Sequence, residues 1–423
     1  MRYDQLPTPT ESALHTLVSF ATDPIHEVLA DWAERYGDRV VFTVLGRTRL
    51  FLNEPALVGQ VLDTDADRYY KHSPVEEMRP HVRQSVFIAN GAEWKPKRHA
   101  HPFESPWMEP WFQAVLPEVQ RMMRERLLPL AGPELDLTSI TRRLSFDVFC
   151  WAVFGKCLDD RLYRAFKSLY DDAALRMQLG IVASPVTLDP FAASQREAWW
   201  EAVTALVEDR ANAPEPSLLA YLARRGTTLE ASLLVDEVST ILFAGVGPVG
   251  VTMASLLYEL GRRPEVLAGL RDAGRSAATT ADLATGPIAR TVSETLRVWP
   301  TVSVLSRTPS QAGLIGDIEV DADIDIFLSP WALHRSPRVW EDPLRFSPDR
   351  FQTAPHPWTF MPFGTGPRTC VGQPWGLFLL RLFTATVAAG WEVEVPQDTP
   401  YRLSYYSGFA RPTHALHGRI RAL

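Results

Sequence analysis

One cysteine stands in a segment whose residue types could hold a metal ion. The segment Phe363–Gly372 runs Phe-Gly-Thr-Gly-Pro-Arg-Thr-Cys-Val-Gly. Its three glycines and its proline predict a tight loop whose backbone can approach a flat ligand closely. Backbone N–H groups aimed at the sulfur of Cys370 would stabilise a thiolate, which is a soft metal ligand, and Arg368 would suit a carboxylate on the same ligand. A buried, inert cysteine is the alternative; we favour the metal site because every spaced feature is present.

This segment resembles the haem-binding signature of the cytochrome P450 family, Phe-x-x-Gly-x-Arg-x-Cys-x-Gly, without a mismatch. The resemblance implies that Cys370 is the proximal thiolate ligand of the iron of haem b. It also implies that Phe363 packs near the sulfur and that Arg368 binds a haem propionate. A thiolate ligand pushes electron density onto the iron and favours O–O cleavage. The glycines of this loop are also expected to contact the cofactor: Gly364, Gly366 and Gly372.

Two further segments resemble family motifs that have a structural role. Glu294-Thr295-Leu296-Arg297 is similar to the family's Glu-x-x-Arg, whose spacing puts both charges on one helix face. Pro348-Asp349-Arg350-Phe351 is similar to its Pro-x-Arg-Phe. Alone, the first pair would be an ordinary surface ion pair. Together, the two motifs imply a triad of Glu294, Arg297 and Arg350 that ties the cysteine loop to the core.

Two more resemblances concern the haem propionates. Trp94-Lys95-Pro96-Lys97-Arg98 is similar to the family's Trp-x-x-x-Arg, whose Trp and Arg contact a propionate. The resemblance therefore implies this role for Trp94 and Arg98, although a basic, exposed helix start would have the same composition. Arg307 stands where relatives place another propionate-binding arginine.

A central segment departs from the family pattern. The family's Ala-Gly-x-(Asp/Glu)-Thr supplies an acid and an alcohol that handle protons during dioxygen activation. Here Ala244 and Gly245 match, but Gly247 replaces the acid and Pro248 replaces the threonine. Pro248 cannot donate an N–H to the carbonyl of Ala244, so we expect a bent helix with a groove that supplies no proton. Thr252 could hold a water there; we favour an ordinary helix threonine bonded to the carbonyl four residues earlier.

The same segment is long enough to cross a membrane. Residues 238–258 carry no charge, and no Asp or Glu occurs between Glu237 and Glu259. Glycines, a proline and several hydroxyl residues interrupt the stretch, so we predict a helix buried in the core.

Periodicity predicts a mainly α protein with minor β structure. By the resemblance this is the cytochrome P450 fold, a helical haem domain with small N-terminal and C-terminal β-sheets. We expect one domain over 1–423, although a length of 423 residues alone suggests two or three. Strands are expected at 40–45, 49–53, 317–327 and in the tail 391–423. Helices are expected at 24–36, 54–63, 109–131, 138–155, 160–178, 191–211, 231–261, 263–273, 283–298 and 373–389.

Composition excludes some classes of protein. The 43 Lys and Arg against 50 Asp and Glu give a net charge of −7, which argues against general nucleic-acid binding. Three cysteines suit a reducing compartment. The first thirty residues show no signal peptide or anchor. We therefore expect a cytoplasmic protein with no membrane partner, similar to soluble bacterial members of the family.

The resemblance implies an oxidoreductase that inserts oxygen from dioxygen into an apolar small molecule, and we expect a role in natural-product biosynthesis. Peroxide-driven oxidation, ring coupling, desaturation or rearrangement would tolerate the missing acid and alcohol. A haem-binding module without catalysis is the third possibility. By analogy the substrate pocket is lined by 71–90, 176–190, 241–252 and 301–306. Its apolar members would be Val86, Phe87, Ile88, Met177, Leu179, Phe243, Val246, Val302 and Val304.

Electrons are expected from an acidic, ferredoxin-type donor. Basic residues gather on one segment of an otherwise acidic chain, and they would steer such a donor. An ordinary solvated helix end is an equally good explanation of the charges. The residues of this expected docking cluster are Lys95, Lys97, Arg98, His99 and His101.

Overall fold

The computed structural model describes residues 1–10, 24–44, 46–71, 78–104, 108–128, 134–182, 190–404 and 410–423. It is mainly helical with small sheets, which confirms the predicted fold class. In chain order the helices are α2 (Ile25–Tyr36), α3 (Pro55–Gly59), α4 (Arg79–Val82), α5 (Gly91–Ala100), α6 (Met108–Leu127), α7 (Leu137–Phe154), α8 (Asp160–Val182), α9 (Pro190–Glu208), α10 (Leu218–Arg225), α11 (Ala231–Gly261), α12 (Pro264–Gly269), α13 (Arg271–Ser276), α14 (Thr280–Ala284), α15 (Gly286–Val298), α16 (Pro330–His334) and α17 (Gln373–Gly390).

Most strands belong to two small sheets. One has the order β1-β2-β8-β5-β3 and the other β4-β12-β9, and two further pairs are β6-β7 and β10-β11. The strands are β1 (Arg39–Val44), β2 (Arg47–Leu52), β3 (Tyr69–Tyr70), β4 (Leu135–Asp136), β5 (Leu305–Pro309), β6 (Gly313–Ile315), β7 (Ile318–Val320), β8 (Asp325–Leu328), β9 (Trp391–Glu394), β10 (Leu403–Ser404), β11 (Arg411–Pro412) and β12 (His417–Ala422).

The five-stranded sheet joins parts of the chain that are far apart in sequence. The predicted hairpin is β1 and β2, which pair antiparallel across a turn at Gly46; Leu45, the last residue of the expected strand, lies outside the described residues. β8 pairs parallel with β2, and Arg49 of β2 lies 3.6 Å from Asp325 of β8 as a buried ion pair. β5 then adds to β8, although the sequence pattern did not predict it. This strand matters because it carries Arg307.

Helix ends follow local capping chemistry. The side chain of Asp136 accepts hydrogen bonds from the N–H groups of Thr138 and Ser139 at the start of α7, and Gly155 ends that helix at a φ of 75°. The short helix α10, which periodicity missed, begins where the Ser217 side chain accepts from the Ala220 N–H. Helices this short carry too few apolar repeats to be recognised from sequence.

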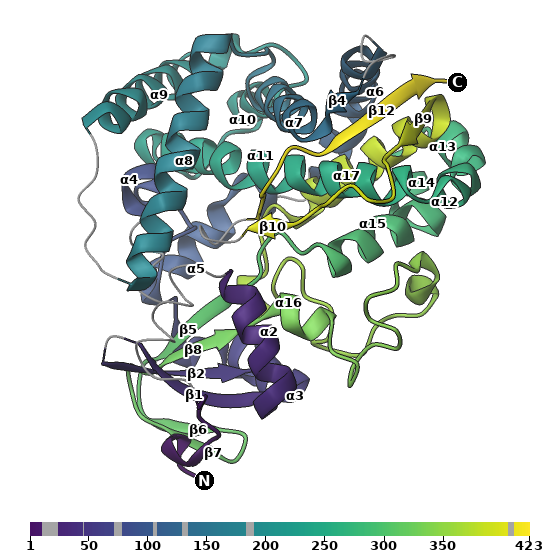
Figure 1. Ribbon diagram of the computed structural model, residues 1–423. Helices are drawn as coiled ribbons and strands as arrows, with labels where there is room; N and C mark the ends of the chain where they lie inside the picture. Colours follow the sequence, from purple (N-terminus) through teal and green to yellow (C-terminus); the bar gives the residue numbers. More distant parts are fainter. Residues whose placement is uncertain are drawn as a thin grey trace.

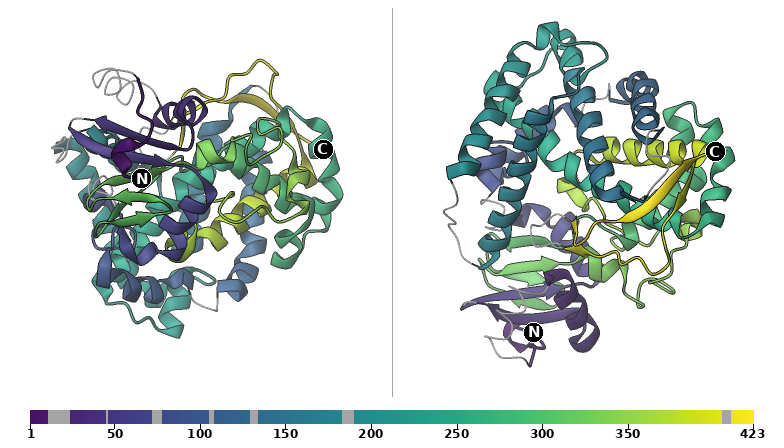
Figure 2. Two further views of the ribbon diagram at one scale, coloured as in Figure 1. Left: turned by 90° about the horizontal axis from the view of Figure 1, so that it is seen from below. Right: turned by 45° about the horizontal axis from the view of Figure 1, so that its top comes forward.

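The long uncharged segment forms α11, which runs through the middle of the helices (Figure 1). By length and composition α11 could cross a membrane, but 83% of its most apolar window is buried inside the protein. It packs against α7, α9, α15 and α17. This confirms the predicted core helix. The five-stranded sheet lies below most of the helices in Figure 1 and in the right-hand view of Figure 2. The N-terminus and the C-terminus lie far apart in both views.

Candidate functional site

The cysteine loop is built by backbone contacts that the glycines allow. The Cys370 N–H donates to the Phe363 carbonyl at 2.9 Å, which closes the loop. Gly364 and Gly366 have φ values of 74° and 72°, which other residues rarely adopt. A side chain at Gly366 would also overlap the Leu62 carbonyl. The phenyl ring of Phe363 lies over Gly376, in the first turn of α17.

The sulfur of Cys370 faces a space inside the protein. Its side chain is exposed, yet surrounding protein raises the pKa of its thiol through burial. The backbone N–H groups of Gly372 and Gln373 hydrogen-bond the sulfur and act in the opposite direction, as does the charge of Arg98. Cys370 also precedes the N-terminus of the 18-residue helix α17, where the helix dipole favours an anion. The loop therefore presents one thiolate ligand to an internal space.

A group of cations lies close to this sulfur. The charges of Arg307 and Arg368 lower the pKa of Lys71, to about 7, after the larger effect of burial. Burial lowers the pKa of Arg307 to about 10, and Arg368 is the one charged group that shifts it further. These cations face one another without a carboxylate that could neutralise Arg307 among the described residues. An anionic ligand, such as the two propionates of haem, fits this cluster together with the thiolate.

Lys71 is a member of this cluster that was not among the predicted site residues. Its ammonium group donates to the Phe87 carbonyl, and it stands just after β3. No motif marked it. A signal did exist, because Lys71 is one of only five lysines in the chain and it falls in a segment expected to line the pocket.

Trp94 and Arg98 share one face of α5, as their spacing implied. The guanidinium of Arg368 lies 4.6 Å from the centre of the Trp94 ring, so the two side chains make a cation–π contact. Arg98 donates to the Thr369 carbonyl at 2.6 Å and lies 2.5 Å from a carboxylate oxygen of Glu104. Arg98 thus holds the cysteine loop directly, and its contact with a propionate stays a prediction.

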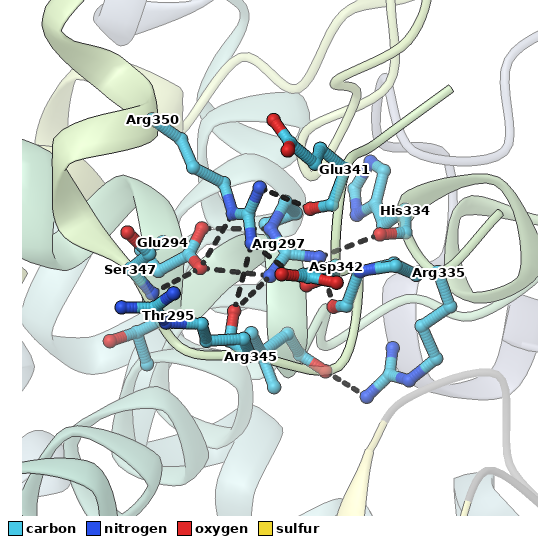
Figure 3. A network of polar contacts seen from close by, with 12 residues as sticks. Glu294, Thr295, Arg297, His334, Arg335, Glu341, Asp342, Arg345, Ser347 and Arg350 are labelled. Atoms are coloured by element: carbon cyan, nitrogen blue, oxygen red, sulfur yellow. Dashed lines mark hydrogen bonds and ion pairs between the residues drawn. The ribbon is translucent and has the colours of Figure 1, made fainter. Parts of the chain in front are cut away.

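The three members of the expected triad are in contact (Figure 3). Arg297 makes two parallel hydrogen bonds to the carboxylate of Glu294, at 2.7 and 2.8 Å, and both side chains are fully buried. Arg350 adds a third contact to Glu294 at 3.3 Å. The remaining N–H groups of Arg297 donate to carbonyls of His334, Pro343 and Arg345.

The triad reaches the cysteine loop through a histidine. His334 gives its carbonyl to Arg297, while its ring nitrogen Nε2 accepts from the Met361 N–H at 3.0 Å. Met361 lies two residues before Phe363. Burial lowers the pKa of His334 to about 3, so the ring stays neutral and can accept this bond. The sequence motifs implied the triad but not this connection.

The central helix turns one small-residue face toward open space. Ala244, Gly245 and Pro248 are half-buried, whereas the residues around them in α11 are buried. α11 continues as a helix through Pro248. Thr252 donates its hydroxyl to the Pro248 carbonyl at 2.9 Å, which is the interpretation we favoured. Its hydroxyl is therefore engaged within the helix.

Gly247 lies on the other side of α11, against α8. A Cβ atom at Gly247 would overlap the phenol of Tyr170, and one at Gly245 would overlap the ring of Phe149. The acid that the family pattern places at 247 is therefore excluded by packing, because the Tyr170 hydroxyl fills its space. Burial raises the pKa of Tyr170 to about 12, so this hydroxyl stays protonated at neutral pH.

The expected docking cluster is not a single exposed patch. His101 is buried and faces Glu237, and Arg98 is used by the cysteine loop. Lys97 donates to the Gln84 carbonyl at 2.8 Å. The expectation was wrong for His101, which is buried just after α5, while Arg98 and Lys97 are half-buried and held by contacts within the protein. Lys95, which pairs with Asp67, and His99 remain at the surface.

Some of the apolar residues expected to line the substrate pocket lie in the hydrophobic core. Val246 belongs to the main core, and its carbonyl accepts from Ser145 of α7. Phe243 packs with Ile88 and Phe87 in a separate apolar cluster. Val302 and Val304 are half-buried before β5, and Val86 is buried; the side chains of Met177 and Leu179 lie outside the described residues.

Comparisons with known proteins agree with this geometry. The family model "Cytochrome P450" matches residues 6–416. A curated relative, the chloroplastic protein LUTEIN DEFICIENT 5 of Arabidopsis thaliana, is 25% identical over 84% of this chain and 68% of its own length. Abscisic acid 8'-hydroxylase 3 of Oryza sativa subsp. indica is 25% identical over 96% of this chain and 84% of its own length. The crystal structure of the cytochrome P450DA heme domain is 22% identical, with a TM-score of 0.85 over 99% of this chain and 97% of that chain.

Arg297→Met should destabilise the protein by about 3–5 kcal/mol, because it leaves the buried Glu294 carboxylate with Arg350 as its remaining ion-pair partner. Urea unfolding measures the change. Arg290→Met is the matched control, since Arg290 lies 3.8 Å from an exposed Asp349 and should cost at most about 1 kcal/mol. Equal losses in the two variants would contradict the role of the triad.

Gly247→Ala should lower stability by about 1–3 kcal/mol, because the added methyl group overlaps Tyr170. In a Tyr170→Ala background most of that cost should disappear, and a double-mutant cycle measures the coupling. Gly245→Ala is the control, since its clash is with Phe149 and should persist. An additive cycle for Gly247 and Tyr170 would show that the phenol does not exclude a side chain at 247.

Proposed function

This chain belongs to the cytochrome P450 family, and on that premise we propose that it oxidises an apolar small molecule with dioxygen and electrons from a ferredoxin-type donor. Family membership makes it a haem-dependent oxidoreductase of the monooxygenase type that uses a small-molecule substrate and a redox partner. The observation that carries the proposal is the complete Cys370 loop, which presents a thiolate beside a group of cations.

We propose haem b as the cofactor, and the thiolate of Cys370 would hold its iron. Lys71, Arg307 and Arg368 would hold the two propionates. They supply positive charge, and no carboxylate of the described residues pairs with Arg307. Trp94 would support Arg368 from the other side. When bound, haem supplies the chemistry that activates dioxygen and cleaves its O–O bond.

The residues of α11 define how protons can reach that site. Ala244, Gly245 and Pro248 form its half-buried face, and none of them has a side chain that can donate a proton. The hydroxyl of Thr252 is bonded to the Pro248 carbonyl, and Tyr170 occupies the space behind Gly247. We propose that protons come from water in the groove, or from a hydroxyl or carboxyl group of the substrate, as general acid catalysis requires a positioned donor.

The proposed substrate is apolar because the wall above α11 is apolar. Phe243, Phe87 and Ile88 form one side of it, and Val302 and Val304 are half-buried on the segment before β5. The curated relatives include a cytokinin hydroxylase and an abscisic acid hydroxylase, which act on small molecules. A biosynthetic role for a natural product in the cytoplasm is our proposal for this chain.

A ferredoxin-type donor is proposed to dock beside α5 and the cysteine loop. Lys95 and His99 are the members of the expected cluster that remain exposed, and Lys95 is paired with Asp67. Steering by two residues depends less on salt than steering by five, so we expect shape and apolar contact to contribute as well.

Cys370→Ser should abolish the red-shifted Soret band that carbon monoxide produces on a reduced haem-thiolate protein. The reason is that serine replaces the soft sulfur ligand with a hydroxyl group. Difference spectroscopy of the reduced protein makes the measurement. Cys157→Ser is the control, because this exposed cysteine lies near Asp147 and outside the loop. An unchanged band in Cys370→Ser would overturn the assignment of the ligand.

Product should form with dioxygen, reductant and a ferredoxin-type donor, and more slowly with hydrogen peroxide alone. The physical reason is that no arginine or other cation at 247 or 248 could bind a carboxylate substrate for peroxide-driven oxidation. The initial rate of product formation, measured by chromatography, compares the two routes, and the yield per electron or per peroxide consumed gives the coupling. Fast and well-coupled turnover with peroxide alone would favour the alternative of a peroxide-driven enzyme. Absence of any turnover with a compound that shifts the haem spectrum would favour a binding module.

A further inference from the structure

The segment between α4 and α5 forms part of the apolar wall above α11. Residues 83–90 connect the two helices, and Phe87 and Ile88 pack with Phe243 of α11. Val86 packs on the other side of the segment with Ala89 and Trp94, the ring that supports Arg368. Residues 83–88 therefore lie between Phe243 of α11 and Trp94, and Phe87 accepts a hydrogen bond from Lys71 of the cation cluster.

Two adjacent acids of α11 hold this segment by its backbone. The N–H of Val86 donates to Glu237 Oε1 at 2.7 Å, and the N–H of Gln84 donates to Asp236 Oδ2 at 3.1 Å. The Glu237 side chain is fully buried. Both acids lie at the N-terminal end of the uncharged stretch, so they are the last carboxyl groups before the half-buried face of Ala244.

The same segment begins in a strained conformation. Arg83 has φ 45° and ψ −113°, which is an unfavourable region for a residue with a side chain. Its guanidinium lies 3.7 Å from the centre of the Trp200 ring of α9 and 3.8 Å from Asp236. Lys97 of α5 donates to the Gln84 carbonyl at 2.8 Å. Contacts from three helices thus hold a turn that would otherwise relax.

We propose that Asp236 and Glu237 are positioning residues that hold residues 83–88 as a wall of the substrate pocket, and that Glu237 releases this wall when it loses its proton. The proposal rests on the proposed function, because it assumes that the space above α11 admits the substrate. It assigns to α11 a second role besides forming the floor of the groove.

Glu237 is an acid whose ionised form is poorly supported where it lies. Burial raises its pKa to about 8, against the opposing effects of the Val86 N–H and of Lys97, and Asp236 raises it further. His101 faces its second oxygen, Oε2, at 3.6 Å. The Phe103 N–H donates to Nδ1 of His101, so the ring carries its proton on Nε2, toward Glu237.

His101 gives Glu237 no positive partner. Burial, and then the charge of Arg98, lower the pKa of His101 to about 3, so the imidazole is neutral at physiological pH. Below its pKa Glu237 is a neutral acid that accepts from Val86 without cost. Above its pKa it becomes a buried carboxylate. The Val86 N–H favours this form, but the cost of burial is the larger effect, and the carboxylate escapes that cost by moving toward water. The charged and titratable groups around it are His101, Lys97, Asp236 and Arg83.

The test measures access to the pocket in the haem-loaded full-length protein, with 4-phenylimidazole as a spectroscopic probe. Stopped-flow mixing gives the association rate about one pH unit below and about one pH unit above the pKa of Glu237. In the unchanged protein the rate should rise about tenfold between the two, since the ionised fraction of Glu237 rises from about 0.09 to about 0.9. In Glu237→Gln, whose neutral amide oxygen can still accept from Val86, the slow rate should persist at both.

Hydrogen exchange of residues 83–88 is the second measurement and does not use the probe. After correction for the intrinsic pH dependence, the N–H of Val86 should exchange about tenfold faster above the pKa in the unchanged protein and equally slowly at both pH values in Glu237→Gln. Glu230→Gln, at the exposed N-cap of α11, is the matched control and should behave as the unchanged protein does.

Two results would overturn the proposal. One is exchange at Val86 that depends on pH equally in Glu237→Gln and in the unchanged protein. The other is exchange that does not depend on pH in either. Failure of the probe to shift the haem spectrum in every variant would instead contradict the proposed function, and the exchange measurement would still decide the role of Glu237.

Discussion

A helix without charges over 21 consecutive residues has to be covered by protein over most of its surface, and this requirement organises the molecule around α11. α7 packs along it so closely that the ring of Phe149 excludes a side chain at Gly245, and α8 does the same to Gly247 through Tyr170. One face, at Ala244 and Pro248, is only half-buried. The open face and the packed faces of one helix therefore separate the site of chemistry from the core.

The second constraint is that buried charges must be paired. Glu294 and Arg297 are fully buried, and every remaining donor of Arg297 bonds a carbonyl of the stretch 334–345. Arg297 therefore holds three backbone carbonyls of this stretch in place. His334 also accepts from the Met361 N–H, which connects the Glu294–Arg297 pair to the cysteine loop. The cations near Cys370 follow the opposite rule, because Arg307 meets another cation rather than a carboxylate among the described residues. A structural charge pair and a ligand site are distinguished by that difference.

The unusual residues at 247 and 248 acquire a physical explanation from packing. The phenol of Tyr170 leaves no room for a side chain at 247, so the tyrosine and an acid at 247 exclude one another in this packing. Proline at 248 leaves Thr252 as the nearest hydroxyl on the helix, and that hydroxyl is bonded to the Pro248 carbonyl. The carboxyl groups of α11 that precede this stretch belong to Asp236 and Glu237, which accept hydrogen bonds from the backbone of residues 83–88.

The sequence alone determined the family, the mainly helical fold and the motifs around Cys370, because these depend on short segments with fixed spacing. Residues 363–372, the pair Glu294 and Arg297 and the uncharged stretch 238–258 all belong to this class. The single domain over 1–423 and the cytoplasmic location stay predictions. Tertiary structure decided the rest: the place of Lys71 among the cations, the inward turn of His101, and the contact between Tyr170 and Gly247. Each of these is a contact between segments far apart in the chain, and local spacing carries no information on which distant side chain fills a given space.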